Sequence, residues 1–223
     1  MSKTINRRSL LKLAPACLLA PLSLSTSVLG CAPTATAETK VDSIFLSTWN
    51  NVTANEITAN EARNGKTTID AIVKGISHVE SDVNDMSVGK GGRPDREGNV
   101  TLDGCIMNHK GDAGGVCYME NIEHPIQVAR DVMNHTPHVL LAGDGATNFA
   151  LQRGYPKVDL LTEKSVKEYE KWKVDSKYSP IPNIEQHDTI GMIGMHGTEL
   201  GGGCSTSGLG YKMQGRVGDS PII

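Results

Sequence analysis

Apolar residues recur at helical spacing in two stretches of the chain. After Thr68 they stand at positions 69, 72, 73, 76 and 79, which fall on one face of a helix. Residues 124–136, HPIQVARDVMNHT, predict a second helix with a proline near its start, where a helix tolerates one. Residues 163–177 carry many charges of both signs and no wide apolar stripe, which is typical of a solvated helix or a linker.

Other stretches have the character of strands. Residues 41–50, VDSIFLSTWN, are short and partly β-branched. Positions 100, 102, 104 and 106 alternate with polar residues, which predicts a half-buried strand, and GGVCYM at 114–119 returns beside it. HVLLAGDG at 138–145 predicts a buried strand ending in glycines, and TIGMIGM with LGGGCSTSG, residues 189–195 and 200–208, predicts a second hairpin. Helices and antiparallel strands in mixed layers indicate an α+β fold.

The cysteines allow two interpretations. Cys105 and Cys117 stand at equal distances from Gly111, so a symmetric hairpin would set them opposite each other. The simpler alternative is two small buried side chains. No C-x-x-C pair occurs, which excludes a zinc ribbon, and the histidines lack a partner at ligand spacing on one helix. We expect neither a metal nor a cofactor.

Composition and charge narrow the class of protein. The chain has 223 residues, which is enough for one substantial domain. Its net charge is −3 and its aromatic content 4%, so it has no electrostatic footprint of nucleic-acid binding. Glycine is abundant, with 24 residues, which suits tight turns more than long helices.

The N-terminus has the pattern of an export signal. Asn6–Lys12, NRRSLLK, is similar to a twin-arginine signal, and prolines interrupt the apolar stretch that follows it up to Leu29. A permanent membrane span is therefore not expected. Residues 28–31, VLGC, resemble a lipobox that would make Cys31 the acylated first residue; the alternative is cleavage after Ala37. Either ending predicts a periplasmic or cell-envelope protein, with residues 1–30 as the signal.

One junction in the chain has a special chemistry. Asp188 and Thr189 stand between a proline-containing loop and a strand. A threonine hydroxyl is a poor nucleophile without a base beside it. If the peptide bond between the two residues were cut, Thr189 would gain an α-amine with an ordinary pKa of about 8, and this amine could act as that base. The ordinary alternative is that both side chains bond to local backbone.

Longer motifs carry a resemblance to a known family. HDTIGMIG at the junction, CSTSGLGYKMQGRVGDSPII after it, and LSTWN, VGKGGRPDREGNVTLDGCIM and HTPHVLLAGDGA before it are similar to glycosylasparaginase. This family consists of self-cleaving N-terminal-nucleophile hydrolases within the wider plant-type asparaginase group. The resemblance runs from Ser43 to Ile223.

The resemblance implies a fold and a set of site residues. The expected fold is a four-layer αββα sandwich, divided into an α chain, residues 41–188, and the start of a β chain, residues 189–223. Thr189 falls on the nucleophile and Asp188 on the self-cleavage acid. The remaining positions fall on the threonine near the nucleophile, the substrate-binding arginine and aspartate, and the pocket tryptophan: Thr206, Arg216, Asp219 and Trp49.

The resemblance also implies an activity and partners. The expected reaction is hydrolysis of the amide between N-acetylglucosamine and asparagine, which releases aspartate. The substrate is a small glycosylated asparagine, and the α and β chains of one precursor stay together and pair into a homodimer of such units. The family continues beyond the position of Ile223, where its oxyanion-hole residues lie, so we expect the sheet to be incomplete here and this stretch alone to be inactive.

Two other functions stay open. One is an isoaspartyl peptidase or L-asparaginase of the same fold. The other is an inert exported binding lipoprotein made from the shortened fold. The mass of the mature protein separates these classes, because two fragments that meet at Thr189 require a working self-cleavage site.

Overall fold

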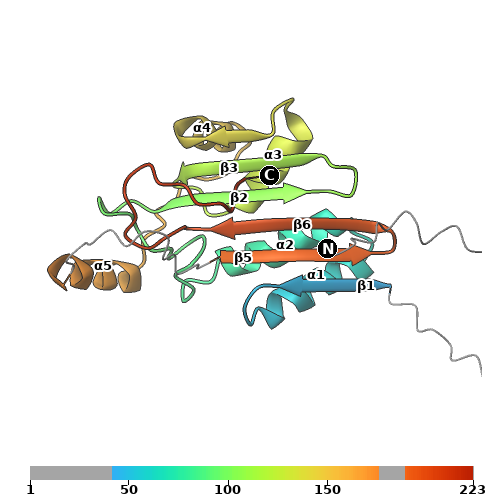
Figure 1. Cartoon of the computed structure of the whole chain (residues 1–223), viewed down its shortest axis with the longest axis horizontal. Coiled ribbons are helices and arrows are strands. Elements are labelled where there is room, and N and C mark those ends of the chain that lie inside the picture. Colours follow the sequence, from blue (N-terminus) through green and yellow to red (C-terminus); the bar gives the residue numbers. More distant parts are fainter. Residues whose placement is uncertain (1–41, 176–188, 223) are drawn as a thin grey trace, which may run out of the picture. The chain divides into compact units, whose positions relative to one another are not determined.

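The structure is a computed structural model that describes residues 42–175 and 189–222. They lie within the compact unit that begins at Lys40 and form one sheet of six strands in the order β1-β5-β6-β2-β3-β4 (Figure 1). All neighbouring strands run antiparallel except β3 and β4, which run parallel. The strands are β1 (Ser43–Ser47), β2 (Thr101–Met107), β3 (Ala113–Glu120), β4 (Leu140–Ala142), β5 (Thr189–His196) and β6 (Glu199–Thr206).

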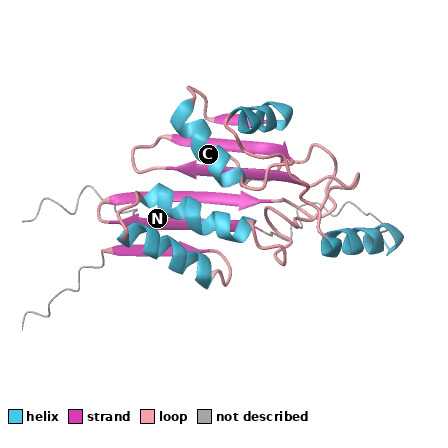
Figure 2. Ribbon diagram, turned by 180° about the vertical axis from the view of Figure 1, so that it is seen from behind, coloured by secondary structure: helices cyan, strands magenta, loops and turns pink. Residues whose placement is uncertain are grey.

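Helices cover one face of this sheet (Figure 2). Two of them, α2 (Thr68–Glu80) and α3 (Pro125–His135), pack on the central strands, and α1 (Val52–Arg63) packs on α2 and β1. The other two are α4 (Gly143–Gln152), which packs on β3, and α5 (Glu163–Asp175). The described residues therefore form two layers, a sheet and a helix layer, and the predicted α+β class is confirmed.

The main core lies between these two layers. Its apolar side chains come from the stripe of α2, from α3, and from one face of the central strands, including Ile106, Ile190 and Met192. Thr67 caps α2 by accepting a hydrogen bond from the N–H of Asp70. Pro125 opens α3, where its missing N–H costs nothing. Both predicted helices are therefore confirmed, and the apolar stripe predicted for α2 is buried.

The second face of the sheet is apolar and largely exposed among the described residues. Alternate residues of β1 and β5 point toward it, and Leu46 and Ile193, which are each 59% exposed, are paired in register. Its other exposed side chains are Ile44, Met107, Leu140, Met195 and Leu200. The two further layers of the expected sandwich stay a prediction, and this face is where a second sheet would pack.

Three sequence interpretations need correction. Helices α1 and α4 were not predicted, because α1 buries only small side chains and α4 begins within the glycines of GDG. The strand at 138–145 is the short edge strand β4, whose residues are exposed or intermediate rather than buried. The start of β2 is buried on both faces rather than half-buried, because residues 207–222 cover its second face, where Lys212 bonds to the carbonyl of Thr101.

Of the two interpretations of the cysteines, the one that set Cys105 opposite Cys117 is wrong, and the two side chains are free, with Cys117 buried and Cys105 partly buried. Cys105 lies opposite Gly115 on β3, because the turn is centred on Lys110 and not on Gly111, so that Met107 pairs with Ala113. The residue opposite Cys105 on its other side is Cys204 of β6. Cys105, Cys117 and Cys204 are all free thiols. Burial, together with the neighbouring Cys204, raises the pKa of Cys105 to about 11.

No helix within residues 42–175 and 189–222 has the length and apolar character needed to cross a membrane.

Candidate active site

Thr189 and Thr206 meet at one end of the sheet. Thr189 begins β5 and Thr206 ends β6, and the antiparallel register places them directly opposite each other. The hydroxyl of Thr189 donates to the hydroxyl of Thr206 over 3.0 Å. Thr206 also accepts a hydrogen bond of 2.9 Å from the backbone N–H of Gly208. The Thr189 hydroxyl is therefore oriented by a buried partner that is itself fixed by the backbone.

The end of β1 holds the backbone of Thr189 from the other side. The carbonyl of Thr189 accepts hydrogen bonds from Thr48 Oγ1 at 2.9 Å and from Trp49 Nε1 at 3.0 Å. Thr48 Oγ1 in turn accepts from the N–H of Gly191 at 2.9 Å. Trp49 has a positive φ of 59°, which a non-glycine residue rarely adopts. This conformation is held at the site, where the indole N–H contacts the residue predicted to be the nucleophile.

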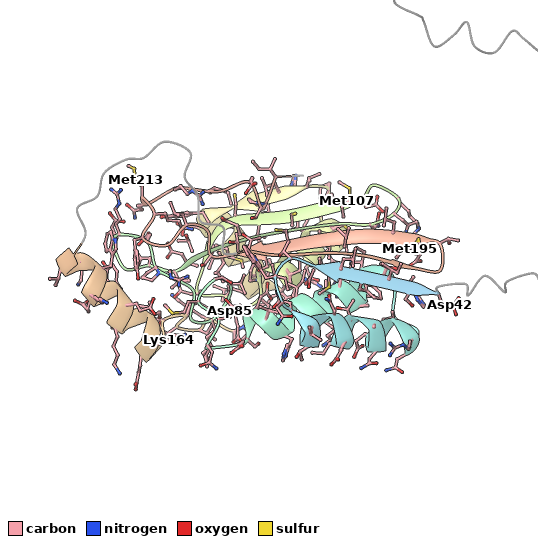
Figure 3. All side chains as sticks on the ribbon, turned by 60° about the horizontal axis from the view of Figure 1, so that its bottom comes forward. Asp42, Asp85, Met107, Lys164, Met195 and Met213 are labelled. Atoms are coloured by element: carbon pink, nitrogen blue, oxygen red, sulfur yellow. The ribbon has the colours of Figure 1, made fainter. Side chains whose placement is uncertain are left out.

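An open cavity of about 430 Å³ borders Thr189 and Trp49. The loop between α2 and β2 supplies much of its wall, including Asp85, Ser87 and Arg93. Asp85 Oδ1 accepts the N–H of Ser87 at 2.7 Å, and the carbonyl of Ser87 accepts the N–H of Ser207 at 2.7 Å. Figure 3 shows Asp85 on the side where Lys164 and Met213 lie, away from Met107 and Met195.

Sequence reasoning missed these wall residues. Their turn-rich loop has no periodicity, and Thr48 and Ser87 hold the site partly through backbone atoms. The usable signal was the position of the loop within a longer family motif, not the side-chain types.

Arg216 lies beside the turn that follows Thr206 and includes Gly208. Its Nη1 atom is 3.1 Å from the point that a Cβ on Gly208 would occupy, and 3.0 Å from the corresponding point on Gly218. Two glycines thus leave room for the guanidinium against its own loop. Because Gly208 also bonds to Thr206, Arg216 is connected to the threonine pair through a single turn.

Asp219 is exposed on the same loop. Its charge raises the pKa of Cys204, although burial is the main cause of that rise. Cys204 lies opposite Gly191, two residues along β5 from Thr189. Arg216 and Asp219 do not line the cavity that Trp49 and Thr189 share. The structure therefore places Trp49 and Thr189 at one cavity, and Arg216 and Asp219 on the loop after Thr206.

A buried pair of charges underlies this loop. Asp103 of β2 and Lys212 are both almost completely buried, at 0% and 2% exposure. Burial raises the pKa of Asp103, against the charges of Lys212 and Arg216 and a hydrogen bond from the N–H of Tyr118. Burial lowers the pKa of Lys212, against the charge of Asp103. Lys212 Nζ donates to the carbonyls of Ser207 and Thr101, at 2.9 and 3.3 Å.

Two predicted residues, Asp188 and Cys31, lie outside the described residues. Within residues 42–175 and 189–222, no group of three or more histidines, cysteines or carboxylates is placed to hold a metal ion.

A family model described as asparaginase matches residues 30–223, which is most of the chain. The chain belongs to the asparaginase family. Within that family its Thr189, at the start of β5 and bonded to Thr206, is the residue around which the described polar contacts converge.

Three curated relatives of this asparaginase-family chain carry the name N(4)-(beta-N-acetylglucosaminyl)-L-asparaginase. The protein from Elizabethkingia miricola is 54% identical over 182 residues, which cover 81% of this chain and 54% of that protein. The protein from Rattus norvegicus is 36% identical over 211 residues, and the protein from Mus musculus 34% identical over 212 residues; each alignment covers 80% of this chain and 61% of the relative. The chain thus spans 54% to 61% of the length of these relatives.

Proposed function

We propose that the protein is a self-cleaving amidohydrolase that splits the amide between N-acetylglucosamine and asparagine and releases aspartate. The observation that carries this proposal is the hydroxyl of Thr189 at the first position of β5, oriented by Thr206. The shared name of three relatives, one of them 54% identical, supports the choice of substrate.

The first step is cleavage of the chain itself. The hydroxyl oxygen of Thr189 attacks the carbonyl carbon of Asp188, and its proton passes to the Asp188 carboxylate. The peptide C–N bond then breaks as an ester forms, and the departing nitrogen of Thr189 takes that proton from Asp188. Water then hydrolyses the ester, which leaves an α-carboxylate on Asp188 and an α-amine on Thr189. The hydrogen bonds from Thr48 and Trp49 support this step, because they fix the Thr189 carbonyl and hence the orientation of the residue.

The second step uses the new α-amine as the base. The amine accepts the hydroxyl proton of Thr189 while the oxygen attacks the side-chain carbonyl of the glycosylated asparagine. The amide bond between the side-chain carbonyl carbon and its nitrogen breaks, and the sugar leaves on that nitrogen as a glycosylamine, which takes the proton. Water then hydrolyses the aspartyl ester. Arg216 binds the α-carboxylate and Asp219 the α-ammonium of the substrate, and Trp49 lines the pocket. An arginine suits this carboxylate because its planar fork donates two parallel hydrogen bonds.

The cellular setting is a further part of this proposal. The protein is exported by a twin-arginine signal, residues 1–30, to the periplasm or cell envelope, with Cys31 as the lipid anchor point or Ala37 as the cleavage point. Residues 41–188 become the α chain and the residues from Thr189 the β chain. Two such pairs form the homodimer. The sequence pattern NRRSLLK supports the export route.

Self-cleavage is the direct test of this function. The protein expressed from its full-length gene should split between Asp188 and Thr189 without added protease, because the nucleophile lies within its own chain. Thr189→Ala removes the attacking oxygen and should leave one intact chain. Mass spectrometry of the wild-type protein and of the variant, with N-terminal sequencing of the second fragment, provides the measurement.

Matched variants and substrates sharpen that test. Thr198→Ala, in the exposed turn between β5 and β6, should cleave like the wild type. Cleaved protein should release aspartate from glycosylasparagine faster than from asparagine or an isoaspartyl dipeptide. A second fragment that begins at any residue other than Thr189 would refute the mechanism, and a preference for the isoaspartyl dipeptide would assign the peptidase function instead.

A further inference from the structure

Helix α5 lies beyond the ends of the strands, apart from the other helices (Figure 1). Its charged sequence predicted a solvated helix or a linker, yet it carries two aromatic residues three positions apart, Tyr169 and Trp172. Residues three apart on a helix are neighbours on its surface. Both side chains are half-buried, so this face of the helix is packed. The reaction proposed above gives the helix no role.

The aromatic partner of this face is Tyr211, which belongs to the segment after Thr206. The ring centroids of Trp172 and Tyr211 are 4.6 Å apart, and the two ring planes differ by 15°. Tyr169 stacks on both rings, with centroid distances of 6.0 and 6.2 Å. Stacked rings at such distances stabilise a contact beyond the area that they bury. Tyr211 also has a positive φ of 58°, a strained conformation that its surroundings maintain.

Hydrogen bonds join the same helix and segment through the loop before β2. The hydroxyl of Tyr169 donates to the carbonyl of Arg96 over 2.7 Å. The N–H of Arg96 donates to the carbonyl of Lys212 over 3.0 Å, and the N–H of Tyr211 donates to the carbonyl of Pro94 over 2.8 Å. The segment that carries Tyr211 is thus connected to α5 both through an aromatic ring and through its backbone.

This segment also carries the two residues assigned to the amino-acid end of the substrate, Arg216 and Asp219. Residues 213–215, which precede Arg216, are all exposed. Tyr211 and Lys212 are therefore the last packed residues before Arg216. Lys212 is fixed from inside the protein, because its buried ammonium donates to two backbone carbonyls. Tyr211 is fixed from outside, by the rings of α5.

We propose that Trp172 is a positioning residue that holds the substrate-binding segment, residues 207–222, in place through its stack on Tyr211. This inference rests on the proposed function, because that function assigns Arg216 and Asp219 to the substrate. Without the stack, a smaller fraction of the protein has this segment in the conformation that binds. The apparent Kd rises as that fraction falls, so KM rises. Bound substrate selects the correct conformation and reacts with an unchanged kcat.

The test compares two apolar replacements that differ in their ability to stack, in protein expressed from the full-length gene. Trp172→Leu removes the flat ring and should raise KM for glycosylasparagine about two- to tenfold, with kcat little changed. Trp172→Phe keeps a flat ring and should stay close to the wild type. Calorimetry of L-aspartate, the product, should give the same order of affinities. The control is Val174→Ala, which removes an 86% exposed side chain from the same helix and should change neither KM nor kcat.

Substitution on the other side of the stack separates stacking from damage to the helix. Tyr211→Leu should raise KM as Trp172→Leu does, and the double variant should be little worse than either single variant, because both changes remove one contact. If Trp172→Leu does not fold, Tyr211→Leu and Tyr211→Phe provide the same comparison. Equal KM values for the leucine and phenylalanine variants would overturn the inference. So would additive effects in the double variant, or a loss confined to kcat.

Failure of the proposed function has a different signature. A wild-type protein that hydrolyses no glycosylasparagine would refute the function, and with it the substrate role of residues 207–222. An active wild-type enzyme whose KM is the same in Trp172→Leu and Trp172→Phe would refute the positioning role alone. A folded Trp172→Leu protein that stays uncleaved would also refute that role, because the stack would then serve self-cleavage and not substrate binding.

Discussion

At the scale of single residues, the shape of a side chain decides which ligand group it can hold. Arg216 is the clearest case, because its planar fork can hold a carboxylate in two hydrogen bonds where a lysine holds it as a point charge. In protein from the full-length gene, Arg216→Lys should lower kcat/KM for glycosylasparagine about tenfold or more, as expected for a lost hydrogen bond to a charged group. Steady-state kinetics measures this ratio.

Self-cleavage provides the control for that variant. It uses Asp188, Thr189 and their neighbours, so Arg216→Lys should still yield two chains. The alternative is that Arg216 and Asp219 pair only with each other on the surface, where such a pair contributes at most about 1 kcal/mol. Near-normal turnover of both Arg216→Lys and Asp219→Asn would return the two residues to that surface role.

The residues that the sequence could identify are those inside distinctive motifs. Thr189, Thr206 and Arg216 were predicted from the family resemblance, and the structure brings the two threonines into contact and places Arg216 next to their turn. Asp103 lies in a quoted motif and Ser87 directly precedes that motif, yet nothing about their residue type indicated a role. Their importance comes from strand register and loop contacts, which depend on residues far away in the chain.

At the scale of elements, one buried carboxylate joins a helix, a helix start and a strand. Glu80 at the end of α2 accepts hydrogen bonds from Ser205 of β6 at 2.7 Å and from the N–H of Ile126 in the first turn of α3 at 3.0 Å. A carboxylate is favourable at a helix N-terminus because of the helix dipole. The other oxygen of Glu80 lies 3.0 Å from His124 Nδ1. This contact makes the junction sensitive to pH.

The expected pH dependence follows from the pKa of His124. Burial lowers this pKa and Lys74 adds to that, but the hydrogen bond and charge of Glu80, with the charge of Glu123, raise it above the ordinary 6.5. A folded-state pKa above the unfolded value stabilises the fold fully below about pH 6.5, and this stability is lost as pH rises through the folded pKa. His124→Gln should therefore lower Tm by a few degrees near pH 6 and by less near pH 9.

Thermal melts of the same protein at the two pH values provide that measurement. His109→Gln, in the exposed turn between β2 and β3, is the matched control and should change Tm little at either pH. A loss of Tm for His124→Gln that is equal at both pH values, or larger at high pH, would contradict the assignment of a protonated His124 beside Glu80.

Prediction of elements succeeded where one face was strongly apolar. The stripe of α2 and the hairpin of β5 and β6 were recovered with their approximate bounds. Helix α1 was missed because it buries Ala54, Thr58 and Ala62, which do not produce an apolar stripe. The alternative that set Cys105 opposite Cys117 was wrong because it assumed a turn centred on Gly111, whereas the register places the centre at Lys110.

At the scale of the whole molecule, the described residues leave one face of a sheet without a covering layer. Leu46 and Ile193 are neighbours across β1 and β5 and are both 59% exposed. Strand β1 also forms an edge of the sheet. Contiguous apolar surface and an unpaired strand edge both favour association with other chains. The helix-covered face, by contrast, is a closed core.

We therefore expect residues 32–223, expressed alone, to be poorly soluble and to lack amidase activity. Leu46→Thr with Ile193→Thr should increase the monomeric fraction, because threonine keeps the preference for a strand while it removes apolar surface. Val174→Thr is the control, since Val174 is 86% exposed but stands apart from this face on α5. Sedimentation velocity measures the species present. A soluble, cooperatively melting and active product would show that this face of the sheet needs no covering layer. If Val174→Thr increased the monomeric fraction as much as Leu46→Thr with Ile193→Thr does, the total apolar surface, and not this face of the sheet, would drive association.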